Sequence, residues 1–473
     1  MSAFEQFYPH LPTALQNIVI STMGYHLRRQ RFGKAFREQL VELNRSERFS
    51  ITQFQALQLK RLKSFVTHCY NTVPYYHYRL RQIGITPEAI QTLDELRKIP
   101  VTPKDDLRAH TAQFLSKIHA PRRLIVAHTS GTTGTPLELG FTVSDFQRRL
   151  GFLYRFLGWH GFRLGQRSAR LSGRTLFPNA ERTRIFWRHN AALRQLFMSS
   201  YHLKPTYLED YVAALERFRP VLIDGYPSSV YVLARFILAK GYRGRVTPAL
   251  IMTTAETLED FQRDAIQVAF GARVVNQYAS SEGAPFITEC EHGSYHVNPE
   301  SGIFEFVRPD TEEPAREGEL AEMIVTAFDT TAYPLLRYRI GDHARFTERP
   351  CACGRAMPLV EEIIGRQEDY LFTQERGFVG RLDPVFKKSP PSIIESQIVQ
   401  IEVDKIILRI VPDRSRFAET DLDVILNEMR VRLGNVAIEV EYHDVLPRGS
   451  NGKLQAVVNL VGVSREFDLA EIG

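Results

Sequence analysis

The segment Thr129-Ser130-Gly131-Thr132-Thr133-Gly134-Thr135-Pro136 decides how the rest of this 473-residue chain is interpreted. Its two glycines let the backbone approach a ligand closely, and its four threonines and one serine offer hydroxyl groups. Together with backbone N–H groups, such a loop can hold the oxygens of a phosphate group. The Gly-Lys-Ser/Thr ending of the P-loop is absent, which excludes the common NTPase motif. An ordinary Gly/Thr surface turn is the alternative.

Short apolar runs that predict strands recur on both sides of this segment. Leu124–Ala127 leads directly into it and is expected to form a short buried strand. Further runs at 221–223, 249–252 and 274–275 each precede a polar turn and a helical pattern. Three strand–loop–helix repeats of this kind predict a parallel sheet that binds its ligand at the carboxyl ends of the strands.

The chain before residue 110 has a mainly helical pattern. Residues 53–110 carry apolar residues at helical spacing, with breaks at prolines. In residues 1–31 apolar residues recur at roughly helical spacing, and three arginines follow them, which is the reverse of the order in a signal peptide. We expect a helix docked on the body of the protein. Contact of this basic amphipathic stretch with a membrane surface is the alternative.

The pattern changes after about residue 286. Alternating apolar and polar residues at 319–325 predict antiparallel strands. Beyond Gly365 we expect a separate small α+β unit, with strands at 405–410 and 437–442 and a helix at 422–433.

Composition excludes several classes of protein. With 44% hydrophobic residues, 30 Phe and 19 Tyr, the chain can bury a large core and is not predominantly disordered. Its 60 Lys and Arg against 54 Asp and Glu give a net charge of +6, which permits an anionic substrate but is too mild to indicate nucleic acid. No run of 18 apolar residues occurs, so we expect no stable membrane insertion. Four unevenly spaced cysteines indicate a reducing compartment, and we expect the cytoplasm.

Three of these cysteines belong to a candidate zinc site. Cys351 and Cys353 form a tight Cys-x-Cys-Gly knuckle, and Cys290 with His296 supplies the other pair of ligands. Three thiolates and one imidazole suit tetrahedral Zn²⁺ in a closed structural site. His292 competes with His296 for the fourth position, and three buried free cysteines without metal are the alternative.

Five motifs resemble, in the same order along the chain, those of the adenylate-forming superfamily, which includes acyl- and aryl-CoA synthetases, peptide-synthetase adenylation domains and luciferases. They are the loop 129–136, Tyr278-Ala279-Ser280-Ser281-Glu282, Tyr338-Arg339-Ile340-Gly341-Asp342, Gly365-Arg366-Gln367-Glu368-Asp369, and Leu446-Pro447-Arg448-Gly449-Ser450-Asn451-Gly452-Lys453. Within this superfamily, residues 71–76, 99–108, 289–290 and 336–339 resemble the phenylacetate–CoA ligase family and its relatives near capsule-biosynthesis genes.

The resemblance implies an α/β fold with two domains. A large N-terminal AMP-binding domain, residues 1–366, is expected to combine parallel sheets and helices with a small β subdomain. It is expected to begin with a helical lead-in, residues 1–110. A small, mobile α+β domain is expected at residues 367–473, with the hinge at 367–369.

The resemblance also implies roles for individual residues. Tyr278 is expected to stack on adenine, and Asp342 to accept hydrogen bonds from the ribose hydroxyls. Glu282 is the candidate Mg²⁺ ligand, because a hard cation prefers carboxylate oxygen. Arg366 is expected to bridge the nucleotide and the hinge, and Lys453 to reach the carboxylate and the α-phosphate. The remaining candidates for nucleotide binding are Thr129, Ser130, Gly131, Thr132, Thr133, Gly134, Thr135, Ala255, Glu256, Ala279 and Ser281.

The expected reaction is the ATP- and Mg²⁺-dependent activation of an aryl or apolar carboxylic acid to an acyl-AMP, with release of pyrophosphate and then transfer to CoA. Residues 370–384 keep only half of the pattern that helps to build the thiol-acceptor tunnel in CoA ligases. A non-CoA acceptor, in surface-polysaccharide or secondary metabolism, is therefore one alternative, and a degenerate nucleotide-binding scaffold is the other. The expected partners are the acid, ATP and CoA, with a homodimer as a further option and no nucleic acid.

Overall fold

A computed structural model describes most of the chain. The described residues are 8–128, 138–172, 183–200, 202–203, 205–255, 258, 260–309, 311–365, 371–379, 382, 385, 389–390, 392–444, 446 and 457–461. They form two compact units. The first draws on residues up to 199 and on 210–365, and the second on residues from 371 onward together with a short segment within 200–209.

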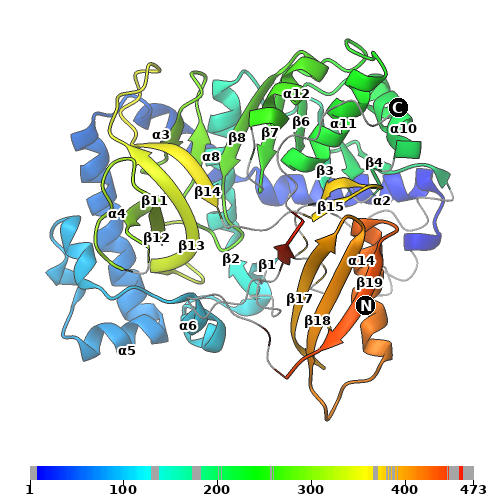
Figure 1. Ribbon diagram of the computed structural model, residues 1–473. Helices are drawn as coiled ribbons and strands as arrows, with labels where there is room; N and C mark the ends of the chain where they lie inside the picture. The colour runs from blue at the N-terminus through cyan, green and yellow to red at the C-terminus, as the bar shows by residue number, and fades with distance from the viewer. Residues whose placement is uncertain are drawn as a thin grey trace. The chain divides into compact units, whose positions relative to one another are not determined.

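The first unit is built on a sheet of twelve strands (Figure 1). Its spatial order is β11-β12-β13-β14-β10-β9-β8-β7-β6-β3-β5-β4. The strands β8, β7, β6, β3 and β5 are parallel neighbours, which confirms the parallel sheet predicted from the strand–loop–helix repeats. These strands are β3 (Ser168–Ser172), β5 (Gln195–Ser199), β6 (Leu222–Gly225), β7 (Leu250–Thr254) and β8 (Arg273–Tyr278), with β4 (Trp187–Asn190) antiparallel at the edge.

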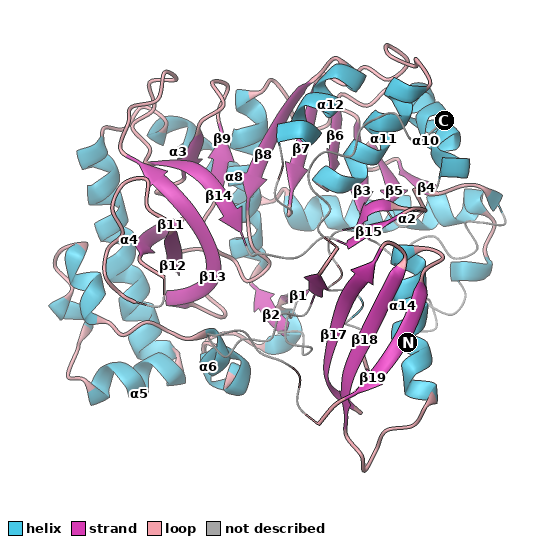
Figure 2. Cartoon of the chain, in the orientation of Figure 1, coloured by secondary structure: helices cyan, strands magenta, loops and turns pink. Residues whose placement is uncertain are grey.

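Helices follow the parallel strands in the manner of α/β proteins (Figure 2). The helix α11 (Pro227–Ala239) follows β6, and α12 (Asp260–Phe270) follows β7. Strands of this part are buried along nearly their whole length, since β6 is buried at all four positions. A strand covered on both faces needs apolar residues at consecutive positions, which explains the continuous runs in the sequence.

The other half of the sheet is antiparallel, as the alternation at 319–325 predicts. Here β12 (Ala321–Ala327) pairs with β11 (Gly302–Val307) and with the long β13 (Leu335–Thr347). The strand β13 pairs in turn with β14 (Leu359–Gly365). The short strands β9 (Ile287–Glu289) and β10 (Tyr295–Val297) join this half to β8. The expected small β subdomain is therefore continuous with the parallel sheet.

Helices occupy most of the chain before this sheet, as their periodicity predicts. They are α2 (Thr13–Arg31), α3 (Lys34–Ser46), α4 (Ile51–Thr72), α5 (Pro74–Gln82), α6 (Lys104–Ala109) and α7 (Thr111–Phe114). Ser50 and Gln53 form a capping box at the start of α4. Pro74 begins α5 at a position where a missing N–H costs nothing, so the break predicted there is confirmed. Among the described residues, every helix is too short or too polar to cross a membrane.

A buried ion pair joins α8 (Val143–Trp159) to the turn before β11. Arg155 donates from Nη1 to Oε1 of Glu300 at 2.6 Å and from Nη2 to Oε2 at 3.2 Å. Both side chains are almost completely buried. Ser46 of α3 also donates to Glu300, so one carboxylate links three separate elements.

The strand expected at Leu124–Ala127 differs from the prediction. The structure has β1 (Ile125–His128), which pairs with β2 (Glu138–Phe141) in a two-stranded antiparallel sheet among the described residues. The expectation of a buried strand is wrong, because Val126 is 48% exposed. A two-stranded sheet outside the main sheet covers one face of each strand and leaves the other open to solvent.

The second unit contains a four-stranded sheet in the order β19-β18-β17-β20. The strands are β17 (Ile393–Glu402), β18 (Lys405–Pro412), β19 (Ala437–Tyr442) and β20 (Val457–Asn459). The helix α14 (Thr420–Leu433) packs its buried residues Leu422, Ile425 and Met429 on this sheet. The predicted strands at 405–410 and 437–442 and the helix at 422–433 are confirmed. A hairpin of β15 (Leu371–Thr373) and β16 (Gly377–Val379) completes the unit.

Candidate active site

The first part of the site lies at the carboxyl end of β8. Tyr278 is the last residue of this strand, and its phenol donates a hydrogen bond to Oδ2 of Asp342 at 2.6 Å. Asp342 belongs to β13 and is buried. The residues expected to bind adenine and ribose are thus adjacent in space although 64 residues separate them in sequence. A buried carboxylate that already accepts one hydrogen bond is well placed to accept another from a sugar hydroxyl.

The candidate Mg²⁺ ligand Glu282 lies four residues beyond β8. Its side chain is only 4% exposed and forms an ion pair with Lys104, with 3.1 Å between Nζ and Oε1. Lys104 is the first residue of α6 and is itself largely buried. A buried carboxylate needs a compensating cation, and Lys104 supplies one to Glu282. Lys104 lies within the stretch 99–108 that resembles the phenylacetate–CoA ligase family, but the sequence pattern indicates no role for it.

A second cation fixes the backbone directly after Glu282. Arg149 of α8 donates from Nη1 to the carbonyl of Gly283 at 2.6 Å and from both Nη atoms to the carbonyl of Ala284 at 3.1 Å. Its guanidinium group lies 4.6 Å from the centre of the Phe286 ring. Burial lowers the pKa of Arg149 to about 10, which still leaves it charged at neutral pH. Sequence reasoning missed Arg149, because an arginine in a helix carries no signal of its backbone partners.

Gly283 is the residue that allows this turn. Its φ of +104° lies in the region that L side chains rarely adopt. A Cβ there would lie 2.6 Å from Cγ2 of Thr330 and 2.9 Å from Cε1 of Phe141. The same turn is closed by Ser280, whose Oγ accepts a hydrogen bond from the Ala284 N–H at 3.0 Å. The turn that carries Glu282 is therefore fixed by hydrogen bonds from Arg149 and to Ser280.

Three further candidates lie at the same strand ends. Ala255 follows β7 with a φ of +73°, a strained conformation for a residue with a side chain. Ala279 packs partly buried against Leu43, Phe152 and Phe286, and Ser281 is exposed at the turn. The other candidates lie outside the described residues; they are 129–135, Glu256, Arg366 and Lys453.

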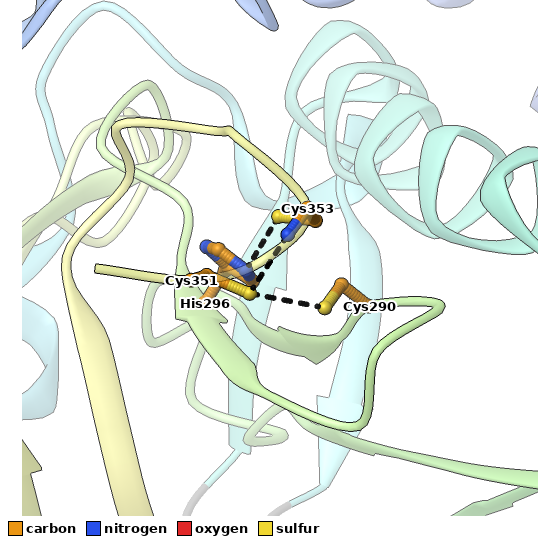
Figure 3. Close-up of side chains that lie close together, drawn as sticks. All are labelled: Cys290, His296, Cys351 and Cys353. Carbon is orange, nitrogen blue, oxygen red and sulfur yellow. Dashed lines mark hydrogen bonds between the residues drawn. The ribbon is translucent and has the colours of Figure 1, made fainter. Parts of the chain in front are cut away.

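A separate group of side chains forms a candidate metal centre (Figure 3). One ligand atom from each of Cys290, His296, Cys351 and Cys353 lies within 4.8 Å of all the others. The sulfur atoms of Cys290 and Cys351 are 3.7 Å apart, and the sulfur of Cys353 is 3.3 Å from Nε2 of His296. Zn–S bonds of about 2.3 Å at a tetrahedral angle place two sulfur atoms about 3.8 Å apart, so this spacing fits the ion.

The local backbone brings these four residues together. Cys290 directly follows β9 and His296 lies within β10, while Cys351 and Cys353 lie between β13 and β14. The N–H of His292 donates to the sulfur of Cys290 and that of Cys353 to the sulfur of Cys351, both at 3.4 Å. Such hydrogen bonds stabilise thiolates. His296, and not His292, belongs to the group.

Burial has opposite consequences for the two kinds of ligand. It lowers the pKa of His296 to about 4, so the imidazole is neutral at pH 7 and can donate its lone pair to a metal. It raises the pKa of Cys290 to about 12, so a bound cation is needed to hold this thiol as a thiolate at neutral pH.

Similarity to known proteins covers nearly the whole chain. The chain is 31% identical to Protein CapK of Staphylococcus aureus over 456 residues, which make up 96% of this chain and 98% of that protein. It is 28% identical to a phenylacetate–coenzyme A ligase of Thermus thermophilus, over 86% of this chain and 97% of the ligase. A family profile, the CapK C-terminal domain, matches residues 371–460.

Solved structures with the same fold include 2-hydroxyisobutyryl-CoA ligase. Its complex with 2-HIB-AMP and CoA in the thioesterification state matches with a TM-score of 0.62 at 20% identity, over 88% of this chain and 91% of that one. The same ligase in its postadenylation state matches with a TM-score of 0.58 at 19% identity, with the same coverage.

Proposed function

We propose that this chain activates a carboxylic acid with ATP, since it belongs to the family of CapK and the phenylacetate–CoA ligases within the adenylate-forming superfamily. It is thus an adenylate-forming ligase. The product of this step is an acyl-AMP, and pyrophosphate leaves. The second step transfers the acyl group to CoA. The acid is aryl or apolar, and Mg²⁺ is required for the first step.

One observation carries this proposal most directly. The hydrogen bond between Tyr278 and Asp342 unites the two residues proposed to bind the nucleoside. A site built for a nucleotide needs a flat apolar face for the base and a fixed acceptor for the ribose, and this pair offers both. The carboxylate of Glu282 follows on the same turn after β8.

The charges of the reaction explain the other proposed roles. Attack of a carboxylate on ATP builds negative charge at the α-phosphate, which fixed positive charges stabilise. We assign the loop 129–135 to the pyrophosphate side, with Ala255, Glu256, Ala279 and Ser281 nearer the nucleoside. Glu282 would hold Mg²⁺, which supplies positive charge opposite the phosphate oxygens. Lys453 provides a mobile positive charge, and Arg366 links the nucleotide to the hinge.

We further propose that residues 367–473 form a domain that closes on the rest of the chain. Lys453 lies in this part, whereas Tyr278, Glu282 and Asp342 lie before residue 366. If the lysine must be delivered by closure, chemistry cannot begin until water is excluded.

The four-ligand group is proposed to bind one structural Zn²⁺ through Cys290, His296, Cys351 and Cys353. Its sulfur spacing fits tetrahedral coordination, and all four ligands come from the protein, as in closed structural sites. Bound zinc would tie the β9–β10 turn to the loop between β13 and β14. These free thiols also favour a reducing compartment, so the proposed location is the cytoplasm.

The proposal is tested by pyrophosphate exchange with a panel of aromatic and aliphatic acids. Acid-dependent exchange of label into ATP is expected for at least one class of acid. Product mass spectrometry with and without CoA then identifies the acceptor. Exchange without a CoA thioester would favour the alternative acceptor, a hydroxyl or a sugar amine. ATP binding without exchange would favour the degenerate nucleotide-binding scaffold, and failure of both exchange and ATP binding would refute the proposed enzyme.

A further inference from the structure

The helix α2 contacts the rest of the protein through polar side chains. Gln16 is 2% exposed and accepts a hydrogen bond from Nε of Arg188 at 2.5 Å. Asn17 accepts from the N–H of His189 at 2.9 Å, and the hydroxyl of Ser21 accepts from the N–H of Ala191 at 3.0 Å. These contacts bind the helix to the edge strand β4 and the turn after it (Figure 1).

The same face allows close approach of the two backbones. A Cβ on Gly24 would lie 2.2 Å from Oδ1 of Asn190, so the lack of a side chain here lets the helix lie near β4 without displacing the Asn190 amide. Gln16, Ile20 and Gly24 recur every four residues and form the buried stripe. The docked helix predicted from the sequence is present, and polar side chains beside its buried stripe make its hydrogen bonds to β4.

The opposite face of α2 exposes apolar side chains. Leu15 is 46%, Ile18 61% and Tyr25 53% exposed. Their spacing places them on one side of the helix together with Arg29, whose guanidinium lies 5.5 Å from the centre of the Tyr25 ring. Met23 is also exposed, but it lies seven residues after Gln16 and therefore beside the buried stripe, not on this face. The helix is therefore oriented with several of its apolar residues outward.

Charge is strongly segregated in this part of the chain. Residues 8–37 contain no Asp or Glu but include Arg28, Arg29, Arg31, Lys34 and Arg37. All of these except Arg31 are exposed. Lys34 is paired with Glu38, with 3.6 Å between Nζ and Oε1, so the positive charge of α2 itself comes from the exposed Arg28 and Arg29 in its last turn.

We propose that the face of α2 formed by Leu15, Ile18, Tyr25 and Arg29 binds the surface of an anionic phospholipid bilayer. Helices that lie in a membrane interface combine exposed aliphatic and aromatic residues with basic residues, and anionic lipid attracts the basic ones. The contact is peripheral, since no helix among the described residues can cross a bilayer.

Charge argues against a second copy of this chain as the occupant. A symmetric dimer through α2 would bring the positive residues of both copies to one interface, where they repel. An acidic bilayer satisfies both features of the face, because its phosphates attract the arginines and its acyl region accepts Ile18 and Leu15.

The test is co-sedimentation of the full chain with vesicles of phosphatidylglycerol and phosphatidylcholine, compared with vesicles of phosphatidylcholine alone. Binding to the anionic vesicles is expected, and it should weaken at high salt. Arg28→Gln with Arg29→Gln should weaken it by about fivefold per charge removed. Ile18→Gln with Tyr25→Gln should weaken it by roughly tenfold or more, because the apolar anchors are lost.

The matched control is Val268→Gln, which removes an exposed apolar residue from α12 and should leave vesicle binding unchanged. Circular dichroism and thermal melting show whether each variant is folded. Absence of binding to anionic vesicles by the folded wild-type chain would overturn the proposal. So would vesicle binding that survives both double substitutions, or a wild-type dimer that Ile18→Gln dissociates while vesicles are not bound.

Discussion

The phenol of Tyr278 donates a hydrogen bond of 2.6 Å to the carboxylate of Asp342, which joins the end of a parallel strand to the middle of the longest antiparallel strand. The pair therefore bridges the two halves of one sheet, because β14, β10 and β9 lie between these strands in the sheet order. Because each strand is held by its own neighbours, the pair is fixed by the fold before any ligand arrives. Such preorganisation lowers the cost of binding.

Asp342→Ala should raise the KM for ATP by about 10–100-fold, because hydrogen bonds to a charged acceptor contribute roughly 1.5–3 kcal/mol. Tyr278→Phe keeps the ring and removes only the hydroxyl, so its effect should be tenfold or less. Pyrophosphate-exchange kinetics at varied ATP measure both. An equal loss in the two variants would contradict the proposal that Asp342 binds the ribose and Tyr278 stacks on the base.

Arg149→Met should raise the Mg²⁺ concentration that gives half-maximal activity, since the turn that carries Glu282 loses its clamp. The carbonyls of Gly283 and Ala284 would lose their donor, which should also lower the free energy of unfolding by about 1–3 kcal/mol. Arg149→Lys is the control that keeps the charge. Activity titrated with Mg²⁺, beside urea unfolding, separates the two effects. An unchanged Mg²⁺ requirement in a destabilised variant would show that Arg149 is purely structural.

The buried pair of Arg155 and Glu300 predicts a dependence of stability on pH. Burial raises the pKa of Glu300, but the charge and hydrogen bonds of Arg155 outweigh burial and hold it below its ordinary value. The pair therefore stabilises the protein at neutral pH, and this contribution is lost as pH falls through the lowered pKa in the folded state. Arg155→Met should lower the free energy of unfolding by about 3–5 kcal/mol at pH 7, because Glu300 is left buried without a cation.

The pH dependence of the Arg155→Met variant tests the direction in which Arg155 shifts the pKa of Glu300. Without Arg155 the pKa of Glu300 should rise above its unfolded value, so the stability deficit relative to wild type should shrink as pH falls from 7 toward 5. Glu300→Gln added to Arg155→Met should recover part of the stability at pH 7. Urea unfolding at both pH values measures these changes. A deficit that stays constant with pH would mean that Glu300 is not buried as a charge.

Metal analysis of the purified protein should find about one Zn²⁺ per chain, bound by the four-ligand group. Cys351→Ser with Cys353→Ser should remove the metal and lower the melting temperature, while ATP binding persists because the nucleotide residues are elsewhere. Cys69→Ser is the matched control, since Cys69 is a buried cysteine outside the group. A metal-free wild-type protein with the melting temperature of the double variant would refute the zinc site.

Lys453→Ala should slow acyl-AMP formation by roughly 10²–10³, the typical cost of removing one donor to a developing charge. ATP affinity should change little, because Tyr278 and Asp342 remain, and preformed acyl-AMP should still react with CoA. Single-turnover assays of each half-reaction measure this. Near-normal adenylation by the variant would exclude Lys453 as the catalytic lysine and with it the closure of residues 367–473 as the step that completes the site.

Local patterns in the sequence were sufficient to predict many of the elements. Continuous apolar runs identified β6, β7 and β8, because a strand covered on both faces needs apolar residues at consecutive positions. Local patterns of apolar residues also identified β18 and α14. The cysteines of the metal group were also predictable, since two of the four ligands lie within three residues of each other. The family was also identifiable from the sequence, because each of its motifs is short and contiguous and the motifs follow one another in the same order along the chain.

Contacts between distant segments were decided only by the tertiary structure. Lys104 meets Glu282 across 178 residues, and Arg149 meets Gly283 across 134, so no local spacing reveals either pair. Val126 was expected to be buried because its neighbours are apolar, but it is exposed. The reason is that β1 pairs with β2 outside the main sheet. The helix α2 was predictable, but its orientation was not. Periodicity shows that a helix has faces, whereas the groups on β4 determine which face is buried.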